Sequence, residues 1–597
     1  MKKLASLNKY FVRYKWRLLL GLIFVTISSE FAVRSAKVIR NILDNVQNKV
    51  KLYYAAKDPI VAKAMTSDIF HMVLIAGLTL LGLALLRGAF MFLQRQTLIV
   101  MSRHIEYDQK NEIFNHYQEL HTHFFKTHFT GDLMNRIAED VSRVRMYTGP
   151  SIMYATNVVA LTVFCVWNMI KVNPMLTLYV VIPLPILAIS IYYVNVIIYR
   201  KSSKIQAQLS GLTTTAQESY SGIRVIKSFV QEGNMLRFFN KNSEDYRQSA
   251  INLSLTESIY FPAMNLFIGL SMLSTVLIGG YYAIQGKITT GNIAEFVYYI
   301  NLLMFPISSI GMVASMIQRA GASQNRIDEF LNTKPEIVSA PDAIEHTLQG
   351  DFDFKHVSFT YQHTGIQALK DFSLHVKPGQ KVAIIGRTGS GKSTIAHLLL
   401  RMYDPQEGAV DMDNISVKKF NLQSLRKQIA YTPQEAFLFS DTIYNNIKFG
   451  RDDATEAEVK EVARLADLDK DITNLPKGYD TIIGERGVML SGGQKQRMVL
   501  ARALLKNSKV LILDECLSAV DTRTEKTILG NLRNYLADKT TVVITHRIFT
   551  SWSFDQILVL DNGRIAEKGT HQELMELNGR YAKLYRHQTE IAAQEEL

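Results

Sequence analysis

Long apolar segments in the first half of the chain restrict its fold more than any other feature. A helix needs roughly 20 mainly apolar residues to cross the hydrocarbon core of a bilayer, and more if it is tilted. Six segments reach that length, at about residues 16–39, 69–102, 149–172, 174–198, 260–286 and 289–320. From about residue 330 onward the chain is an ordinary mixture of apolar and charged residues. We therefore expect one half of the chain in lipid and the other half in water.

The connections between these segments predict how the chain crosses the membrane. The third and fourth segments are separated only by residues 172–174, and the fifth and sixth only by Lys287 and Ile288. Residues 103–148 and 199–259 are long, polar and helix-patterned, so both must project from the same side. Residues 40–68 are expected to form an outer loop, although they carry five basic residues. Basic residues at the helix ends favour a cytoplasmic location for the two long extensions and the N-terminus; they are Arg103, Lys110, Arg200, Lys201 and Lys204.

Composition excludes several classes of function. Two cysteines, Cys165 and Cys516, are too few for a disulfide framework or a thiolate metal site. The net charge of +13 is spread along the chain and not gathered in one block. Membrane lipids with anionic headgroups are therefore the expected partner, and no nucleic acid is expected. The basic N-terminus precedes an apolar segment without a small-residue cleavage site, so we interpret it as the cytoplasmic approach to a retained helix.

A phosphate-binding motif stands in the second half of the chain. The runs at residues 381–386, 510–515 and 540–545 are continuously apolar, as strands buried on both faces of a parallel sheet are. The first run leads into G-x-x-x-x-G-K-S and then a helical stretch, which is the strand, loop and helix order of a P-loop. The loop's backbone N–H groups and the helix N-terminus suit a triphosphate. The predicted ATP-binding residues are Gly386, Arg387, Thr388, Gly389, Ser390, Gly391, Lys392, Ser393 and Thr394.

A pair of carboxylates ends the second apolar run. Asp514 is predicted to hold Mg²⁺ together with Ser393, and Glu515 to orient or deprotonate the attacking water. Lys392 is expected to reach the β- and γ-phosphates. ATP and Mg²⁺ are thus the expected cofactors.

Between these motifs lies the sequence Leu-Ser-Gly-Gly-Gln, at residues 490–494. With it, the soluble half resembles the nucleotide-binding domain of the ATP-binding cassette (ABC) superfamily, and the whole chain resembles an exporter-type half-transporter of the multidrug and lipid exporter family. In that family this signature grips the γ-phosphate of the nucleotide held by the partner subunit, so a single copy implies a dimer. The resemblance gives that role to Ser491, Gly492, Gly493 and Gln494.

Further elements of the family follow in order. Tyr361 matches the aromatic residue that stacks on adenine, and Gln434 the glutamine that touches Mg²⁺ and links to the membrane domain. Residues 518–521 match a loop that communicates with the opposite site. His546 matches the histidine that contacts the γ-phosphate, so we expect Glu515, His546 and Lys392 to be the catalytic residues. Residues 124–145 and 218–232 resemble the two cytoplasmic extensions, whose tips dock on nucleotide-binding domains.

The resulting fold is multi-domain. We expect an all-α six-helix transmembrane domain at residues 1–325, a linker at 326–350, and an α/β P-loop ATPase domain at 351–590. The protein is expected in the plasma or inner membrane of the cell, with the N-terminus and the ATPase domain in the cytoplasm.

The transported substrate is much less constrained by sequence. Charges inside a membrane are costly and usually face the bundle interior or pair with each other. Soft and aromatic side chains suit an adaptable pocket for bulky amphiphiles, although packing alone explains them more readily. Glu30 has the alternative of an ion pair with Arg34, four residues further along. The candidate cavity residues are Glu30, Arg87, Tyr298 and Met304.

The sequence predicts ATP-driven export of hydrophobic or amphipathic molecules, drug-like or lipid-like. Both halves of the split ATP site are intact in one chain, which favours a homodimer and leaves a heterodimer open. The alternatives are an importer or lipid floppase of the same fold, and an ATP-gated channel or regulatory ATPase.

Overall fold

The chain divides into two compact units. The computed structural model describes residues 2–55, 59–548 and 552–595. The first unit, which we name the helical unit, comprises Met1–Gln118 and Gly131–Thr333. The second, the sheet unit, comprises Glu119–Thr130 and Lys334–Leu597. Twelve residues of the first cytoplasmic extension thus group with the second unit.

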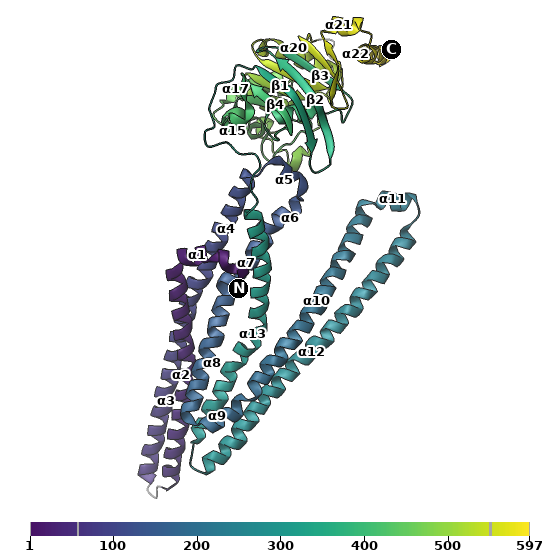
Figure 1. Cartoon of the computed structure of the whole chain (residues 1–597). Helices are drawn as coiled ribbons and strands as arrows, with labels where there is room; N and C mark the ends of the chain where they lie inside the picture. The colour runs from purple at the N-terminus through teal and green to yellow at the C-terminus, as the bar shows by residue number, and fades with distance from the viewer. Residues whose placement is uncertain (1, 56–58, 549–551, 596–597) are drawn as a thin grey trace. The chain divides into compact units, whose positions relative to one another are not determined.

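The helical unit consists of long helices that run beside one another (Figure 1). A π-helical turn at Arg95–Ile99 joins the second and third of the long helices without a break. The helices are α1 (Asn8–Arg13), α2 (Lys15–Ala55), α3 (Pro59–Gln94), α4 (Val100–Glu119), α6 (Thr130–Asn135), α7 (Val141–Met146), α8 (Ile152–Val172), α9 (Pro174–Val181), α10 (Pro183–Ser221), α11 (Ile223–Ser228), α12 (Glu232–Ile284) and α13 (Thr290–Leu331).

Five helical stretches in the described residues are long and apolar enough to cross a membrane. They contain the predicted segments one, two, three, five and six. The fourth predicted segment, 174–198, is helical but divided between α9 and α10, because Pro183 lacks the N–H that would continue the helix. The tight connection before it is confirmed: Asn173 caps α9 by accepting a hydrogen bond from the backbone N–H of Leu176 at 3.0 Å.

Two boundaries differ from the sequence interpretation. Most of residues 40–68 are helical and not a loop, because α2 and α3 extend well past the apolar stretch and are tied together by an ion pair of 3.0 Å between Lys49 and Asp68. Helix α13 continues to Leu331, past the expected end of the domain at residue 325. Polar residues near its end are held by packing and hydrogen bonds, such as the one from Gln324 to Asp328, which hydropathy does not register.

The sheet unit contains a mixed six-stranded sheet in the order β10-β9-β3-β8-β7-β6 and a four-stranded antiparallel sheet in the order β2-β1-β4-β5. Strands β6, β7, β8, β3 and β9 are parallel. The strands are β1 (Phe352–Tyr361), β2 (Ile366–Val376), β3 (Lys381–Gly386), β4 (Glu407–Met412), β5 (Ile415–Ser416), β6 (Ile429–Thr432), β7 (Val510–Asp514), β8 (Thr540–Thr545), β9 (Gln556–Asp561) and β10 (Arg564–Gly569).

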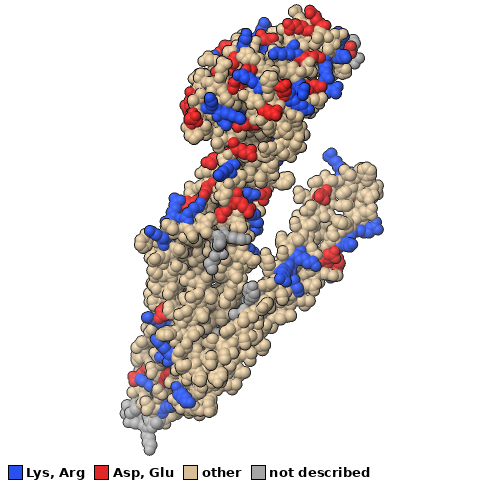
Figure 2. Space-filling model, in the orientation of Figure 1, with Lys and Arg blue, Asp and Glu red and all other residues tan. Residues whose placement is uncertain are grey.

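The sheet unit also contains helices, and each predicted buried strand is present in its larger sheet. The helices are α5 (Thr122–Thr127), α14 (Lys392–Leu399), α15 (Leu422–Lys427), α16 (Ile443–Lys448), α17 (Glu456–Leu465), α18 (Asp469–Thr473), α19 (Gly492–Leu505), α20 (Thr522–Tyr535), α21 (His571–Glu576) and α22 (Arg580–Glu595). Figure 2 shows charged side chains densely spread over the sheet unit and sparse along the apolar lengths of the helical unit.

The strand order determines where a site can form. Strands β3, β8 and β7 are neighbours and run in the same direction, so their carboxyl ends lie at one edge of the sheet. The residues that follow these three strands are the phosphate loop, His546 and the carboxylate pair. Ligands of such sheets bind outside the carboxyl ends of the strands.

Candidate functional site

The phosphate loop connects β3 to α14 in a conformation that depends on glycine. Gly391, the last residue before α14, has φ +100°, and a Cβ there would lie 2.1 Å from the carbonyl oxygen of Ala368. No side chain fits that space, and the left-handed backbone favours glycine. Because no side chain stands at Gly391, the backbone N–H groups of the loop stay accessible at the N-terminus of α14, where an anion is favoured.

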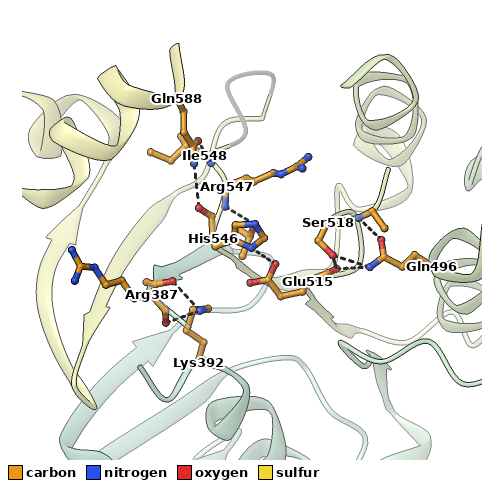
Figure 3. A network of polar contacts seen from close by, with 12 residues as sticks. Arg387, Lys392, Gln496, Glu515, Ser518, His546, Arg547, Ile548 and Gln588 are labelled. Carbon is orange, nitrogen blue, oxygen red and sulfur yellow. Dashed lines mark hydrogen bonds and ion pairs between the residues drawn. The ribbon is translucent and has the colours of Figure 1, made fainter. Parts of the chain in front are cut away.

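Lys392 is the first residue of α14, and its side chain contacts this loop. Its Nζ donates hydrogen bonds to the carbonyl oxygens of Gly386 at 2.9 Å and Arg387 at 3.1 Å (Figure 3). The side chain is only 7% exposed, and burial lowers the pKa of the ammonium group although Glu515 and Asp514 act in the opposite direction. A buried cation with two carboxylates nearby can bind a phosphate chain that replaces the carbonyl contacts.

The carboxylate pair occupies the end of β7. Asp514 is fully buried, and neither of its carboxylate oxygens has a hydrogen bond in the described part of the chain. Burial raises its pKa to about 6, with the charge of Glu515 acting in the same direction and Ser393, Lys392 and Tyr431 acting in the opposite direction. Two buried, unpartnered oxygens are costly unless a cation or donor binds them.

Glu515 has a different environment. Its φ of 49° lies in the left-handed region, which is strained for a residue with a side chain. Oε2 of Glu515 lies 2.6 Å from Nδ1 of His546 (Figure 3). The glutamate is 7% exposed, whereas the imidazole is half exposed. The pair can hold a water molecule or a phosphate oxygen at the open side of the histidine.

Most of the predicted ATP-binding residues line one cavity of about 390 Å³. The predicted residues in its wall are Tyr361, Thr388, Gly389, Gly391, Lys392, Ser393, Thr394, Gln434 and Glu515. Gly386, Arg387, Ser390, Asp514 and His546 lie beside this wall, in the loops just described. The hydroxyl of Tyr361 is fixed by Thr394 Oγ1 at 3.1 Å and by His397 Nδ1 at 3.2 Å, so its ring has a defined orientation.

Seven residues in the cavity wall were not predicted: Lys126, His363, Thr364, Ile366, Ala368, His397 and Tyr403. Lys126 comes from α5 in the first cytoplasmic extension, more than two hundred residues before the phosphate loop. His397 and Tyr403 follow the loop, and no motif identifies them. Burial, together with Lys126, lowers the pKa of His397 to about 4. This histidine is neutral at physiological pH.

The signature residues are in another part of the sheet unit. Ser491 caps α19: its hydroxyl accepts a hydrogen bond from the backbone N–H of Gln494, whose side chain accepts one from the backbone N–H of Ser491. None of residues 491–494 is in the wall of the 390 Å³ cavity. One chain therefore presents its signature and its phosphate loop as separate surfaces.

Comparison with known proteins identifies the chain. It is 34% identical, over 99% of its length and 98% of the relative's, to the multidrug resistance-like ATP-binding protein MdlA of Escherichia coli. The chain belongs to the ABC transporter family. The family model of the ABC transporter transmembrane region matches residues 18–307, and that of the ABC transporter matches residues 369–518.

Other relatives of this ABC transporter agree. It is 37% identical to a probable multidrug resistance ABC transporter ATP-binding/permease protein of Bacillus subtilis, YheI, over 81% of this chain and 83% of the relative. It is 34% identical to an ATP-dependent lipid A-core flippase of Pseudomonas putida, over 85% and 84% of the two chains. The solved structure of a bacterial Atm1-family ABC exporter with ATP bound matches with a TM-score of 0.74 at 27% identity, covering 98% of this chain and 99% of that one.

These comparisons confirm the family and the fold predicted from sequence. The chain is a multi-pass membrane protein and an exporter-type half-transporter, which works as a dimer. Its C-terminal domain binds nucleotide, and the transporter couples ATP hydrolysis to transport across a membrane.

The candidate substrate residues of the transporter lie on three helices of the helical unit, α2, α3 and α13. Glu30 pairs with Arg34 at 2.9 Å, as the alternative interpretation expected. Tyr298 packs against the apolar core of the helical unit, and Met304 is exposed. Arg87 is partly buried on α3. A shared substrate cavity formed by these four residues stays a prediction.

A buried carboxylate in the helical unit was missed. Glu295 in α13 is fully buried and accepts hydrogen bonds from Tyr299 at 2.7 Å and Asn292 at 3.3 Å. Arg40 of α2 pairs with it at 3.2 Å. Nearby, Asp44 of α2 accepts a hydrogen bond from the backbone N–H of Gly291 at 2.8 Å. The cluster fastens the start of α13 to α2, and hydropathy alone does not reveal it.

Proposed function

We propose that this ABC transporter is a homodimer that exports hydrophobic or amphipathic molecules and hydrolyses ATP at sites shared between the two subunits. One observation carries this proposal. The phosphate loop, Glu515 and His546 of one chain form a half-site, while the signature of the same chain lies elsewhere. Both halves are intact, so two copies can complete each other's sites without another protein.

The geometry supports a specific division of labour in hydrolysis. Lys392 and the loop's N–H groups bind the β- and γ-phosphates, and Tyr361 stacks on adenine. Glu515 accepts the proton of the attacking water, and His546 binds the γ-phosphate while its other nitrogen contacts the glutamate. The signature residues Ser491–Gln494 bind the nucleotide of the other subunit.

The chemistry at the end of β7 fits Mg²⁺. Asp514 offers two buried oxygens that have no hydrogen bond among the residues the structure describes, and Ser393 is close enough to affect its pKa. Oxygen donors of this type are the ligands that Mg²⁺ prefers. We propose Asp514, Ser393 and Gln434 as the residues that hold it, and its charge would offset that of the phosphates.

Orientation and substrate class follow from other features. The basic helix ends of the two cytoplasmic extensions support a cytoplasmic N-terminus and ATPase domain in the plasma or inner membrane. The multidrug and lipid A-core names of the relatives support bulky, partly apolar substrates, with Glu30, Arg87, Tyr298 and Met304 as cavity candidates. An importer, a gated channel or a regulatory ATPase is not favoured by these comparisons.

The test is transport by the chain alone. The purified protein is reconstituted into liposomes with the ATPase domain outside, and uptake of a cationic and of a neutral fluorescent amphiphile is followed with ATP and Mg²⁺. We expect ATP-dependent accumulation against a gradient without any second polypeptide. ATPase activity without uptake would refute export, and absence of ATPase activity in a folded preparation would refute the homodimer.

Glu515→Gln provides the mechanistic control. It should retain ATP binding and slow turnover by about 10²- to 10⁴-fold, the effect of losing a general base. Glu525→Gln is the matched variant, because Glu525 is a partly buried glutamate of the same unit that pairs with Arg547 and is not in the wall of the cavity. Its turnover should stay near that of the parent. A Glu515→Gln variant that turns over within a few-fold of the parent contradicts the assignment.

A further inference from the structure

Gln496 in α19 connects two functional segments that the motifs treat as separate. It lies two residues after the signature and is 9% exposed. Its amide Nε2 donates to the carbonyl oxygen of Glu515 at 3.2 Å and to Oγ of Ser518 at 2.8 Å (Figure 3). Its Oε1 accepts the backbone N–H of Ala519 at 2.9 Å. Both polar atoms of the Gln496 side chain therefore make their hydrogen bonds to the turn that follows β7.

That turn holds Glu515 in its strained conformation. The carbonyl oxygen of Glu515 also accepts hydrogen bonds from Ser518, through its backbone N–H at 3.3 Å and its hydroxyl at 2.9 Å. The backbone N–H of Glu515 donates a hydrogen bond to the carbonyl oxygen of Ile544 at 2.9 Å. A left-handed residue with a side chain persists only where its surroundings fix it. Gln496 is the component of this support that comes from the signature helix.

The start of α19 also packs directly on the same turn. A Cβ on Gly493 would lie 2.9 Å from the carbonyl oxygen of Ala519. A Cβ on Gly492 would lie 3.7 Å from the Cβ of Ala519. The backbone of the signature and the turn after Glu515 thus approach as closely as glycine allows. Gln496 fastens the two with hydrogen bonds, so a displacement of one segment is passed to the other.

We propose that Gln496 is a positioning residue that bridges the two ATP sites of the dimer. This inference rests on the proposed function, in which the signature binds the partner's nucleotide and Glu515 acts on the chain's own. When the signature closes on the partner's ATP, Gln496 holds the turn that orients Glu515. Hydrolysis at one site is thereby tied to occupancy of the other.

The first experiment compares two glutamine variants of the full chain in lipid. Gln496→Leu removes the three hydrogen bonds at similar volume. Gln428→Leu is the control, because the side chain of Gln428 also makes hydrogen bonds to the backbone at both of its ends. It donates to the carbonyl oxygen of His346 and accepts from the backbone N–H of Leu348, at 2.8 Å each, far along the chain from the signature. For Gln496→Leu we expect kcat to fall about tenfold, which corresponds to one hydrogen bond of ordinary strength.

ATP affinity and cooperativity give the readouts that a merely structural role would not produce. Gln496→Leu leaves the phosphate loop unchanged, so the ATP affinity of the nucleotide-depleted variant should stay within about threefold of the parent's. The Hill coefficient of the variant for ATP should fall toward one. Gln496→Glu keeps the acceptor for Ala519 and should recover part of the cooperativity. Gln428→Leu should leave kcat and the Hill coefficient unchanged.

The second experiment separates a bridge from local support of Glu515. In the Glu515→Gln background hydrolysis is slow, and release of retained ATP reports how firmly each signature holds the opposite nucleotide. Adding Gln496→Leu should speed release about tenfold. Unchanged release together with reduced kcat would mean that Gln496 serves only its own site, which overturns the bridge.

Unchanged kcat in Gln496→Leu overturns the proposal whatever the release rate. Failure of the proposed function has a different signature: the single variant Glu515→Gln then hydrolyses ATP at a rate near that of the parent. In that event the kcat and Hill coefficient of Gln496→Leu still decide whether Gln496 matters to turnover.

Discussion

Removing the buried carboxylate of Glu295 should destabilise the helical unit far more than removing the carboxylate of Glu30. The side chain of Glu295 is 1% exposed and that of Arg40 is 29% exposed. Glu295→Ala would remove the acceptor of the Tyr299 hydroxyl and the Asn292 amide, and would leave the charge of Arg40 without its carboxylate, with only the Asn41 side chain still accepting from it. Each of these donors is held in or near the core.

The magnitude follows from that exposure. Breaking a fully buried ion pair from one side costs about 3–5 kcal/mol, and the partial exposure of Arg40 places this case near 3 kcal/mol. Glu295→Gln keeps an acceptor for Tyr299 and should cost about 1–2 kcal/mol. The Glu30–Arg34 pair lies on one helix face with side chains 32% and 58% exposed. Glu30→Gln should therefore cost no more than about 0.5 kcal/mol.

The assay is the free energy of unfolding of the full-length protein in detergent micelles, from denaturant titration of the parent and the three variants. Transport of a cationic and a neutral amphiphile is measured in parallel. A loss for Glu295→Ala no larger than that for Glu30→Gln would refute the account of the cluster. If Glu30→Gln is stable and transports the two amphiphiles in an unchanged ratio, Glu30 has neither a structural nor a substrate-binding role.

Two further predictions concern the sheet unit. Burial and Lys126 lower the pKa of His397 from 6.5 to about 4. Between these two pH values the imidazole binds a proton in the unfolded chain but not in the folded chain, so the free energy of unfolding falls as the pH drops. Acidification from pH 7 to pH 5 should cost about 2 kcal/mol through this group, and His397→Gln should show a smaller drop in the thermal unfolding midpoint. Gly391→Ala should abolish ATP binding, because its Cβ would meet the backbone of Ala368 at 2.1 Å; an unchanged ATP affinity by equilibrium binding would contradict this.

Local sequence was sufficient for the nucleotide half-site. The phosphate loop, from Gly386 to Thr394, carries its chemistry within nine consecutive residues whose glycines admit one backbone path. The three buried strands were recognised because both of their faces are apolar. Parallel pairing of β3, β8 and β7 then brings their following residues to one edge, so motif order predicted the meeting of Lys392, Glu515 and His546.

Helix lengths were harder to predict from the sequence. Hydropathy detects where a helix contacts lipid but not where it ends, because backbone hydrogen bonds and polar contacts continue α2, α3 and α13 beyond the apolar stretch. The division at Pro183 depends on a missing N–H and not on hydropathy.

Sequence by itself determined the family, the order of the domains and the residues of the phosphate loop, because each depends on neighbours in the chain or on the length of an apolar run. Tertiary structure alone decided which distant residues share an environment. Lys126 enters the wall of the nucleotide cavity, Gln496 joins the signature to Glu515, and Arg40 reaches Glu295 across more than two hundred residues. Such contacts leave no periodicity or spacing in the sequence, since packing of separate elements, and not local backbone preference, creates them.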